Sequence, residues 1–300
     1  MLQEFDTRNE NILVYIDGEL LHRNDAKISV FDSTVQGGDA VWEGLRVYDG
    51  RIFALEEHLN RLIDSAHSLA FEGVPSQETI IQAIESTLSA NKMKDDTHIR
   101  LTLSRGLKYT SGMDPRLNKY GCTLIVLAEW KSPVYGRTGI KLISTSTRRN
   151  SPQFLDSKIH HNNLLNNILA KIEANASGAD DGLMLDDQGF VAETNACNIF
   201  FIKAGQVFTP TSRACLPGIT RKMVIQLCED LKLKCTEGNY SLTQFYTADF
   251  VFVTGTMGEL VGVNEIDGRK IRVENGQELF TRLSKAYKDL TKNSGYKLTV

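Results

Sequence analysis

The sequence lacks the long apolar run that a transmembrane helix requires. No stretch of the chain approaches the ~20 apolar residues needed to cross a bilayer. The opening segment, MLQEFDTRNE, carries acids where a signal peptide has a basic start followed by apolar residues. The sequence therefore predicts a cytoplasmic protein that has no membrane partner.

An excess of charge of either sign is also missing. The 34 basic and 37 acidic side chains leave a formal net charge of -3, which gives no reason to expect nucleic acid as a partner. Any anion must then be bound by a few placed cations rather than by a general positive field. Hydrophobic residues make up 41% and charged residues 24% of the chain, which argues against a disordered or fibrous protein.

Patterns that bind metals are absent as well. The five cysteines are odd in number, and no two of them have CxxC spacing. His160 and His161 are adjacent rather than one helical turn apart, which does not suit zinc. We therefore expect no metal site, and we expect reduced core thiols because a chain of 300 residues needs no disulfides to hold its core.

Residues 1–130 predict a small α/β domain. Asp-Gly pairs lie between alternating apolar residues in ILVYIDGEL and LRVYDGRIF, which predicts two β-hairpins. The apolar spacing predicts helices over residues 54–69 and 77–90, and HIRLTLSRG and CTLIVLAEW are expected to be strands. Residues 131–139, KSPVYGRTG, concentrate Ser, Pro and Gly and are interpreted as an interdomain linker.

Residues 140–300 predict a larger second domain that begins with the strand GIKLISTST. Hairpins are expected at GLMLDDQGFVAE and NIFFIKAGQVFTP, a buried strand at ADFVFVTGT, and an amphipathic helix over residues 278–292. Gly218 should open a helix that runs to about Leu231. A further helix is expected over residues 162–176. Its expected buried stripe consists of Leu164, Leu165, Ile168, Leu169 and Ile172.

Two side chains could carry chemistry on a bound aldehyde. Lys158 lies just before the helix expected at residues 162–176, and a lysine amine can bond to a carbonyl carbon once its pKa is lowered. Glu193 lies where a hairpin strand ends, and a carboxylate that faces a pyridine nitrogen keeps that nitrogen protonated. The alternative for each is an ordinary charged side chain in solvent.

Three further features could bind a phosphate. Residues 216–220, LPGIT, place a Pro-Gly pair directly before a helix, where free N–H groups and the helix dipole attract an anion. Residues 254–260, TGTMGEL, predict a similar turn after a buried strand. Arg61 lies beside the apolar stripe of its helix and could hold a phosphate through two N–H bonds. The alternative for Arg61 is a surface ion pair with Glu57.

Six segments resemble, in the same order, segments of the class IV aminotransferase family. They are VWEGLRVYDG, EEHLNRL, KIHHNNLLNNILAKIEA, AETNACNIF, LPGIT and TGTMGELVGVNEIDGRKI. The resemblance implies an α/β enzyme of fold type IV, with a small α/β domain and a larger β-barrel-like one, which pairs as a homodimer. It also implies that Lys158 is catalytic and bonds to pyridoxal 5'-phosphate. The residues implied for the cofactor are Arg61, Lys158, Glu193, Asn198, Gly218, Ile219, Thr220 and Thr256.

The same resemblance bears on the substrates, which should be amino acids and 2-oxo acids. WEGLR is closer to the branched-chain enzymes than to the D-amino-acid ones, whose stretch reads VYEVVKVY. It implies transfer of an amino group from a branched-chain L-amino acid to 2-oxoglutarate, with Arg100 on the distal carboxylate. The alternative for Arg100 is a strand arginine at a sheet edge. The residues implied for the substrate are Trp42, Gly44, Arg100, Trp130, Thr256 and Met257.

The sequence departs from the branched-chain pattern where aromatic side chains are expected. Gly37, His98 and either Asn162 or Asn163 occupy these places, so a D-amino-acid aminotransferase remains an alternative. A lyase that resembles aminodeoxychorismate lyase is a second alternative on the same fold. A non-catalytic binding protein is a third, although it would have no need of the Lys158 amine.

Overall fold

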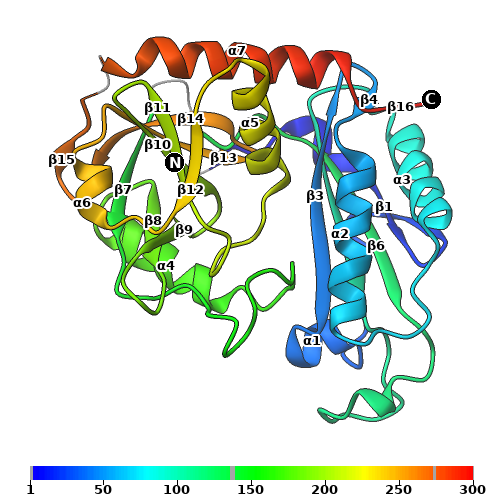
Figure 1. Ribbon diagram of the computed structural model, residues 1–300. Coiled ribbons are helices and arrows are strands. Elements are labelled where there is room, and N and C mark those ends of the chain that lie inside the picture. Colours follow the sequence, from blue (N-terminus) through cyan, green and yellow to red (C-terminus); the bar gives the residue numbers. More distant parts are fainter. Residues whose placement is uncertain (1–2, 136–138, 273–274, 300) are drawn as a thin grey trace. The chain divides into compact units, whose positions relative to one another are not determined.

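The computed structural model describes residues 3–135, 139–272 and 275–299, and these residues form two units, each with its own sheet and core (Figure 1). The N-terminal unit contains the described residues up to Ser132, the segment Ile159–Asn163 and the described residues from Thr291 onward. The C-terminal unit contains the described residues of Pro133–Lys158 and Leu164–Leu290. The proposed division into residues 1–130, a linker and residues 140–300 stays a prediction, and residues 136–138 of that linker lie outside the described residues.

The N-terminal unit is built on a seven-stranded antiparallel sheet with the order β16-β4-β3-β5-β6-β1-β2. Both predicted Asp-Gly hairpins are confirmed, with Asp17 and Asp49 each at positive φ, which aspartate tolerates in tight turns. The strands are β1 (Leu13–Ile16), β2 (Glu19–His22), β3 (Ala40–Tyr48), β4 (Arg51–Ile52), β5 (Thr97–Ser104), β6 (Thr123–Trp130) and β16 (Tyr296–Lys297).

Helices α2 (Leu55–Ser68) and α3 (Gln77–Asn91) pack against this sheet, α2 on β3 and α3 on β6 and β1 (Figure 1). Both helices agree with the expected ranges, and the Ser76 side chain caps α3 by accepting a hydrogen bond from Thr79 N. Because side chains alternate along a strand, the odd-numbered residues of β3 enter the helix-covered core while the even-numbered ones lie on the other face. The short elements are η1 (Thr7–Asn11), α1 (Ser33–Gly37) and η2 (Pro115–Leu117).

The C-terminal unit is built on a nine-stranded mixed sheet with the order β12-β11-β10-β13-β14-β7-β8-β9, to which β15 adds beside β14. Strand β9 ends this order, yet a short turn joins it to β10 in the interior, and Thr194 N donates to Cys197 O across that turn at 2.8 Å. The sheet is therefore curled, and the expected α/β fold with a barrel-like larger part is confirmed. The strands are β7 (Ile140–Ser144), β8 (Asp181–Leu185), β9 (Val191–Thr194), β10 (Asn198–Lys203), β11 (Gln206–Pro210), β12 (Cys235–Gly238), β13 (Phe250–Gly255), β14 (Glu259–Ile266) and β15 (Arg269–Lys270).

The helices that follow these strands include two that matter for the site. Helix α5 (Ile219–Asp230) begins directly after Gly218, as the sequence predicted. Helix α4 (Leu165–Ala176) begins three residues later than expected. The remaining helices are α6 (Leu242–Tyr246) and α7 (Gln277–Asn293). None of the helices in the described part of the chain is both long and apolar enough to cross a membrane.

The predicted buried stripe of α4 is wrong. Ala170 and Ala174 are the buried residues of this helix, which packs on β8. The periodicity of the sequence located the apolar face correctly but could not show which face packs within the chain. The exposed apolar residues of the helix are Leu165, Ile168, Leu169 and Ile172.

Candidate active site

Glu193 lies on β9 in the C-terminal unit with its carboxylate buried. Arg149 Nε donates to Glu193 Oε1 at 2.5 Å, and both side chains are more than nine-tenths buried. Leu216 N donates to the same oxygen at 3.2 Å, and Asn198 Nδ2 donates to Oε2 at 3.0 Å. The alternative of a glutamate in solvent is therefore excluded. A carboxylate offers about four acceptor positions, so these three donors leave room for one more on Oε2.

Burial is the main influence on the charge of this carboxyl. Burial raises the pKa of Glu193 above its ordinary value, and the Arg149 guanidinium acts in the opposite direction. A buried carboxylate is costly unless a cation and hydrogen bonds accompany it. Arg149 therefore has the role of keeping Glu193 ionised, and the sequence analysis did not name it.

The N-terminus of α5 lies beside this pair. Asn198 Nδ2 also donates to Leu216 O at 2.9 Å, which ties the loop before α5 to the acid. Gly218 is the N-cap and no side chain caps this end, so its N–H groups face outward from the helix. A Cβ on Gly218 would lie 1.9 Å from Asn198 Oδ1, so only glycine allows the loop to approach this closely. The structure thus brings the predicted residues Glu193, Asn198 and Gly218 together with Ile219 and Thr220, which begin the helix.

Thr254 adds an unused hydroxyl at the same place. It pairs in register with Asn198 across β13 and β10, and among the described residues its buried Oγ1 has no hydrogen-bond partner. The predicted residues Thr256 and Met257 follow in the turn between β13 and β14. Val134 N donates to Met257 O at 3.2 Å, so the segment after Ser132 is fastened to this turn.

Lys158 is exposed at the end of a loop of the C-terminal unit. Its Nζ lies 3.3 Å from Asp156 Oδ1 and 3.4 Å from the carbonyl oxygen of Arg213. Arg213 belongs to the same loop as Leu216, whose N–H binds Glu193. The lysine amine and the buried acid are thus fastened to one loop, which places them in one neighbourhood.

These residues fit pyridoxal phosphate. The acceptor position left on Glu193 suits a protonated ring nitrogen, and the uncapped end of α5 suits a phosphate. The orphaned hydroxyl of Thr254 is the kind of buried donor that a bound polar ligand satisfies. Lys158 supplies the amine.

Arg61 belongs to the N-terminal unit, where it binds Glu43 instead of Glu57. Its Nε donates to Glu43 Oε1 at 2.8 Å and its Nη2 to Glu43 Oε2 at 2.7 Å, which is a two-bond fork. The Glu43 side chain is completely buried and the Arg61 side chain is 15% exposed. The predicted surface pair with Glu57 is thereby excluded, whereas the phosphate role of Arg61 stays a prediction.

Arg100 and Trp42 lie together on the face of the N-terminal sheet that the helices do not cover. The Arg100 guanidinium carbon is 3.7 Å from the centre of the Trp42 ring, and Arg100 Nη2 donates to Asn162 Oδ1 at 3.2 Å. Arg100 pairs in register with Gly44 on β3 and lies on β5, between β3 and β6, so the alternative of an edge position is excluded. A Cβ on Gly44 would lie 3.3 Å from His98 Nε2, so this glycine makes room for the histidine.

Trp130 does not join this group. Trp130 pairs with Thr97, which pairs with Val47, whereas Trp42 is five residues from Val47 along β3. An odd separation places the two tryptophans on opposite faces of the sheet. Trp130 packs against the helix-covered core, and its ring lies 5.2 Å from the guanidinium carbon of Arg8. Its substrate role therefore remains a prediction without support from Trp42.

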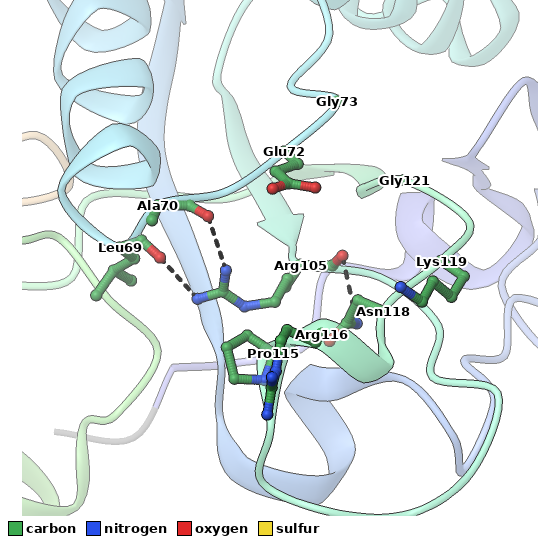
Figure 2. Close-up of a pocket in the computed structure, with 10 residues that line it drawn as sticks. All are labelled: Leu69, Ala70, Glu72, Gly73, Arg105, Pro115, Arg116, Asn118, Lys119 and Gly121. Atoms are coloured by element: carbon green, nitrogen blue, oxygen red, sulfur yellow. Dashed lines mark hydrogen bonds between the residues drawn. The ribbon is translucent and has the colours of Figure 1, made fainter.

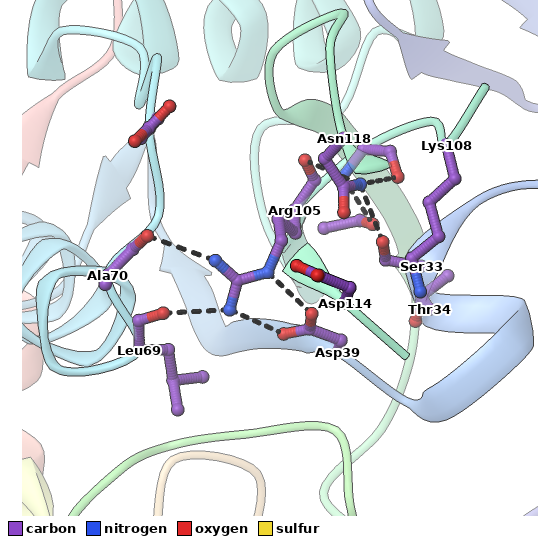
Figure 3. A network of polar contacts seen from close by, with 12 residues as sticks. Ser33, Thr34, Asp39, Leu69, Ala70, Arg105, Lys108, Asp114 and Asn118 are labelled. Atoms are coloured by element: carbon purple, nitrogen blue, oxygen red, sulfur yellow. Dashed lines mark hydrogen bonds and ion pairs between the residues drawn. The ribbon is translucent and has the colours of Figure 1, made fainter. Parts of the chain in front are cut away.

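A pocket of about 580 Å³ lies elsewhere in the N-terminal unit (Figure 2). Its arginines are already paired. Arg105 binds Asp39 and two main-chain carbonyls (Figure 3). Arg116 binds Asp114. None of the predicted site residues is among those that line it. We therefore do not assign the pocket to the candidate active site.

Comparisons with known proteins agree with this geometry. The sequence model of the family described as amino-transferase class IV matches residues 40–266. The chain is 58% identical over 288 residues to the branched-chain-amino-acid aminotransferase-like protein 2 of Arabidopsis thaliana, covering 96% of this chain but 52% of that protein. The chain thus spans about half the length of this plant relative.

Two other relatives match along nearly their whole length. A putative branched-chain-amino-acid aminotransferase of Methanocaldococcus jannaschii is 40% identical over 287 residues, which is 95% of this chain and 98% of that protein. The crystal structure of a T.th. branched-chain amino acid aminotransferase complexed with N-(5'-phosphopyridoxyl)-L-glutamate has a TM-score of 0.87 and 32% identity, covering 94% of both chains. The fold and the site define an α/β protein of the pyridoxal-phosphate type. The chain belongs to the class IV aminotransferase family.

Proposed function

We propose that this protein is a pyridoxal-phosphate-dependent transaminase that moves an amino group from a branched-chain L-amino acid to 2-oxoglutarate. The observation that carries the proposal is the buried Glu193–Arg149 pair, which lies beside the uncapped N-terminus of α5. Lys158 contacts the loop that leads into this helix. The names of the relatives support the amino-acid class.

Each residue has a separate task in this reaction. When bound, the cofactor supplies an aldehyde that takes up the amino group and a ring that accepts electrons from the substrate Cα. Lys158 Nζ would take the proton from the substrate Cα and deliver it to the former aldehyde carbon of the cofactor. Glu193 would accept a hydrogen bond from the ring nitrogen and keep it protonated, while Arg149 keeps Glu193 ionised. Ile219, Thr220 and Thr256 would donate N–H and O–H groups to the phosphate, and Arg61 is the arginine proposed to bind it as well.

Arg100 supports a dicarboxylate acceptor. Its guanidinium lies over the Trp42 ring and donates one hydrogen bond to Asn162, which restricts its direction. Its charge suits the distal carboxylate of 2-oxoglutarate. The T.th. relative has been crystallised with a phosphopyridoxyl derivative of L-glutamate, the partner acid of 2-oxoglutarate in transamination. The partly exposed ring of Trp42 supplies apolar surface next to Arg100 for an aliphatic side chain.

A D-amino-acid aminotransferase is the second candidate. His98 occupies the place of one expected aromatic side chain, and either Asn162 or Asn163 occupies that of another. His98 and Asn162 put polar atoms next to Arg100. Burial, together with the charges of Lys131 and Arg100, lowers the pKa of His98 to about 3, so this ring is neutral near pH 7. The N–H group of a neutral histidine in this place can donate a hydrogen bond to a substrate carboxylate that is bound in another orientation.

The exposed face of α4 supports a homodimer. Leu165, Ile168, Leu169 and Ile172 recur at helical spacing on one face and are each 45% exposed or more. A contiguous exposed apolar stripe marks a surface that another protein covers. The family suggests that this partner is a second copy of the chain, so that each copy covers the α4 stripe of the other. The cytoplasmic location stays a prediction.

One experiment tests the reaction and its lysine together. Purified protein should absorb like a lysine-bound pyridoxal phosphate, and borohydride reduction followed by peptide mapping should place the label on Lys158. Lys158→Ala should lose turnover by at least ~10²-fold, because it removes the general base, while retaining some cofactor through the phosphate contacts. A label on another lysine, or turnover by Lys158→Ala at the wild-type rate, would contradict the proposal.

The choice of substrate needs its own assay. Half-reactions with L-leucine, L-glutamate and D-alanine should convert the bound cofactor to its amine form, and we expect L-leucine and L-glutamate to be fast. Rapid conversion by D-alanine alone would favour the second candidate. Release of pyruvate from an aminodeoxychorismate-like substrate would instead identify a lyase.

A further inference from the structure

Glu43, the partner of Arg61, is completely buried and has no role so far in the proposed reaction. It lies on β3, on the face that helix α2 covers, and both of its oxygens are fully used. Oε1 accepts from Arg61 Nε at 2.8 Å and from His160 Nδ1 at 3.1 Å. Oε2 accepts from Arg61 Nη2 at 2.7 Å and lies 2.6 Å from His58 Nδ1. One acid therefore orders three side chains from two separate segments.

The segment that carries His160 is the one that follows Lys158 directly. Trp42 N donates to His160 O at 2.9 Å and Asn162 N donates to Ala40 O at 2.8 Å, so the segment lies along β3 like an added strand. His160 N also donates to Ser65 Oγ at 3.1 Å, on the same helix as Arg61. Glu43 thus joins, through its two oxygens, the helix of Arg61 to the segment two residues after Lys158.

The charges in this cluster identify Arg61 as the cation that faces the Glu43 carboxylate. Burial raises the pKa of the Glu43 carboxyl, but the Arg61 guanidinium and the hydrogen bond with His160 outweigh burial and hold the pKa well below its usual value. Burial lowers the pKa of His160 to about 4, so this ring is neutral near pH 7 and Arg61 supplies the positive charge. The ionised carboxylate then fixes the guanidinium by two parallel bonds, which restrict its direction as well as its place.

Stability does not by itself account for such a cluster. A buried ion pair is rarely better for stability than well-packed apolar side chains of the same volume, because both charges lose their water. What the pair supplies is a fixed geometry, since a fork between guanidinium and carboxylate holds the arginine in one rotamer. This favours a role in orienting Arg61 rather than in holding the unit together.

We propose that Glu43 is a positioning residue that aims Arg61 at the cofactor phosphate and, through His160, fixes the segment next to Lys158. The proposal rests on the proposed function, because it needs a phosphate for Arg61 to hold. It predicts that loss of Glu43 weakens the binding of every ligand that carries the phosphate. Loss of His160 alone should impair only the covalent attachment to Lys158.

The test separates phosphate binding from covalent attachment by using two forms of the cofactor. Pyridoxamine 5'-phosphate has no aldehyde, so its dissociation constant reports ring and phosphate contacts alone. Glu43→Gln should raise this constant by about tenfold or more, as losses of outer partners commonly do. Glu56→Gln makes the same change on an exposed position of α2 and should leave the constant unchanged.

Two further variants keep the proposal testable if Glu43→Gln folds poorly. Glu43→Asp keeps the charge but is shorter by one methylene, so it should fold and still bind pyridoxamine 5'-phosphate about tenfold more weakly. His160→Gln leaves the Glu43–Arg61 fork intact. It should bind pyridoxamine 5'-phosphate normally but attach pyridoxal 5'-phosphate to Lys158 several times more slowly, as measured by borohydride trapping.

The outcomes distinguish the two proposals. If the wild-type protein binds neither form of the cofactor, the proposed function fails and this inference fails with it. If the wild-type protein binds both forms while Glu43→Gln and Glu43→Asp bind them as tightly as Glu56→Gln does, the role of Glu43 is refuted and the proposed function stands. Normal attachment rates in His160→Gln would overturn the link to Lys158.

Discussion

At the scale of single residues, each unit contains a buried acid that is paired with an arginine. Glu193 has Arg149 and Glu43 has Arg61, and in both pairs the guanidinium Nε binds the carboxylate directly. An isolated buried carboxylate would become protonated, and a protonated acid could neither hold a ring nitrogen in its charged form nor fix an arginine. The two arginines are therefore as important to the proposed chemistry as the acids.

Removal of Arg149 should move the acid limb of the pH profile. Burial already raises the pKa of Glu193 and Arg149 opposes it, so Arg149→Met should raise that pKa further. The fraction of ionised Glu193 at a given acidic pH then falls, and kcat/KM should begin to decline at a higher pH than in the wild type. Arg148→Met alters the exposed neighbouring arginine and should leave the profile in place. An unchanged acid limb in Arg149→Met would contradict the role given to Arg149.

Removal of Arg100 should change the choice of acceptor. Arg100→Leu keeps an apolar contact with Trp42 but loses the charge, so KM for 2-oxoglutarate should rise by ~10–100-fold, the usual range for one charged hydrogen bond. The half-reaction with L-leucine has no distal carboxylate and should change little. Equal losses for the two substrates would mean that Arg100 acts on the fold instead.

Sequence and structure agree unevenly at this scale. Glu193 and the glycine at position 218 could be singled out from local patterns, because one lies in a hairpin strand and the other directly before a helix. Lys158 lies in the loop before α4 and was assigned through the family resemblance. Arg149 and Glu43 could not be singled out, because each is recognised only by a partner that is distant in sequence, 44 residues away in one pair and 18 in the other. The sequence also could not show on which face of the sheet Trp130 lies, because that face follows from the register between strands and not from spacing along the chain.

At the scale of elements, most helices and hairpins followed from turn residues and apolar spacing. The Asp-Gly turns, the Ser76 cap and Gly218 each specify a local backbone that few other residues favour. The short strands β12, β15 and β16 were not predicted, because each is only 2 to 4 residues long and exists through pairing with a distant strand. Local sequence carries no information on that partner.

The turn before α5 can be tested at this scale. Gly218→Ala places a Cβ 1.9 Å from Asn198 Oδ1, so either the turn or the Asn198 side chain must shift. Because Asn198 binds both Glu193 and Leu216 O, either shift disturbs the contact between the turn and the acid. We expect a weaker affinity for pyridoxamine 5'-phosphate and a lower melting temperature. The double variant Gly218→Ala/Asn198→Ala removes the colliding atom and should recover the melting temperature of Asn198→Ala alone, which is a non-additive result. Additive losses of melting temperature would show that another contact is at fault.

At the scale of the whole molecule, the exposed stripe of α4 is a feature that a single chain leaves unexplained. Each isoleucine or leucine that becomes fully buried contributes about 1.5–3 kcal/mol, so a stripe of four has a large effect when a partner covers it. The sequence could show the stripe but not its partner, since periodicity is the same whether an apolar face packs inside a chain or between chains. A symmetric pair buries the stripe of both copies in one interface.

Ile168→Glu should therefore separate the pair. Because a two-fold interface repeats every contact, one substitution places two carboxylates in the same apolar surface, and burying unpaired charges is costly. Sedimentation at micromolar concentration should show dimers for the wild type and monomers for the variant, with the circular dichroism of the folded chain retained. Gln82→Glu adds the same charge to an exposed position of α3 and should remain a dimer. A dimeric Ile168→Glu would show that α4 is covered by something other than a second copy, and a monomeric wild type would rule out the pairing itself.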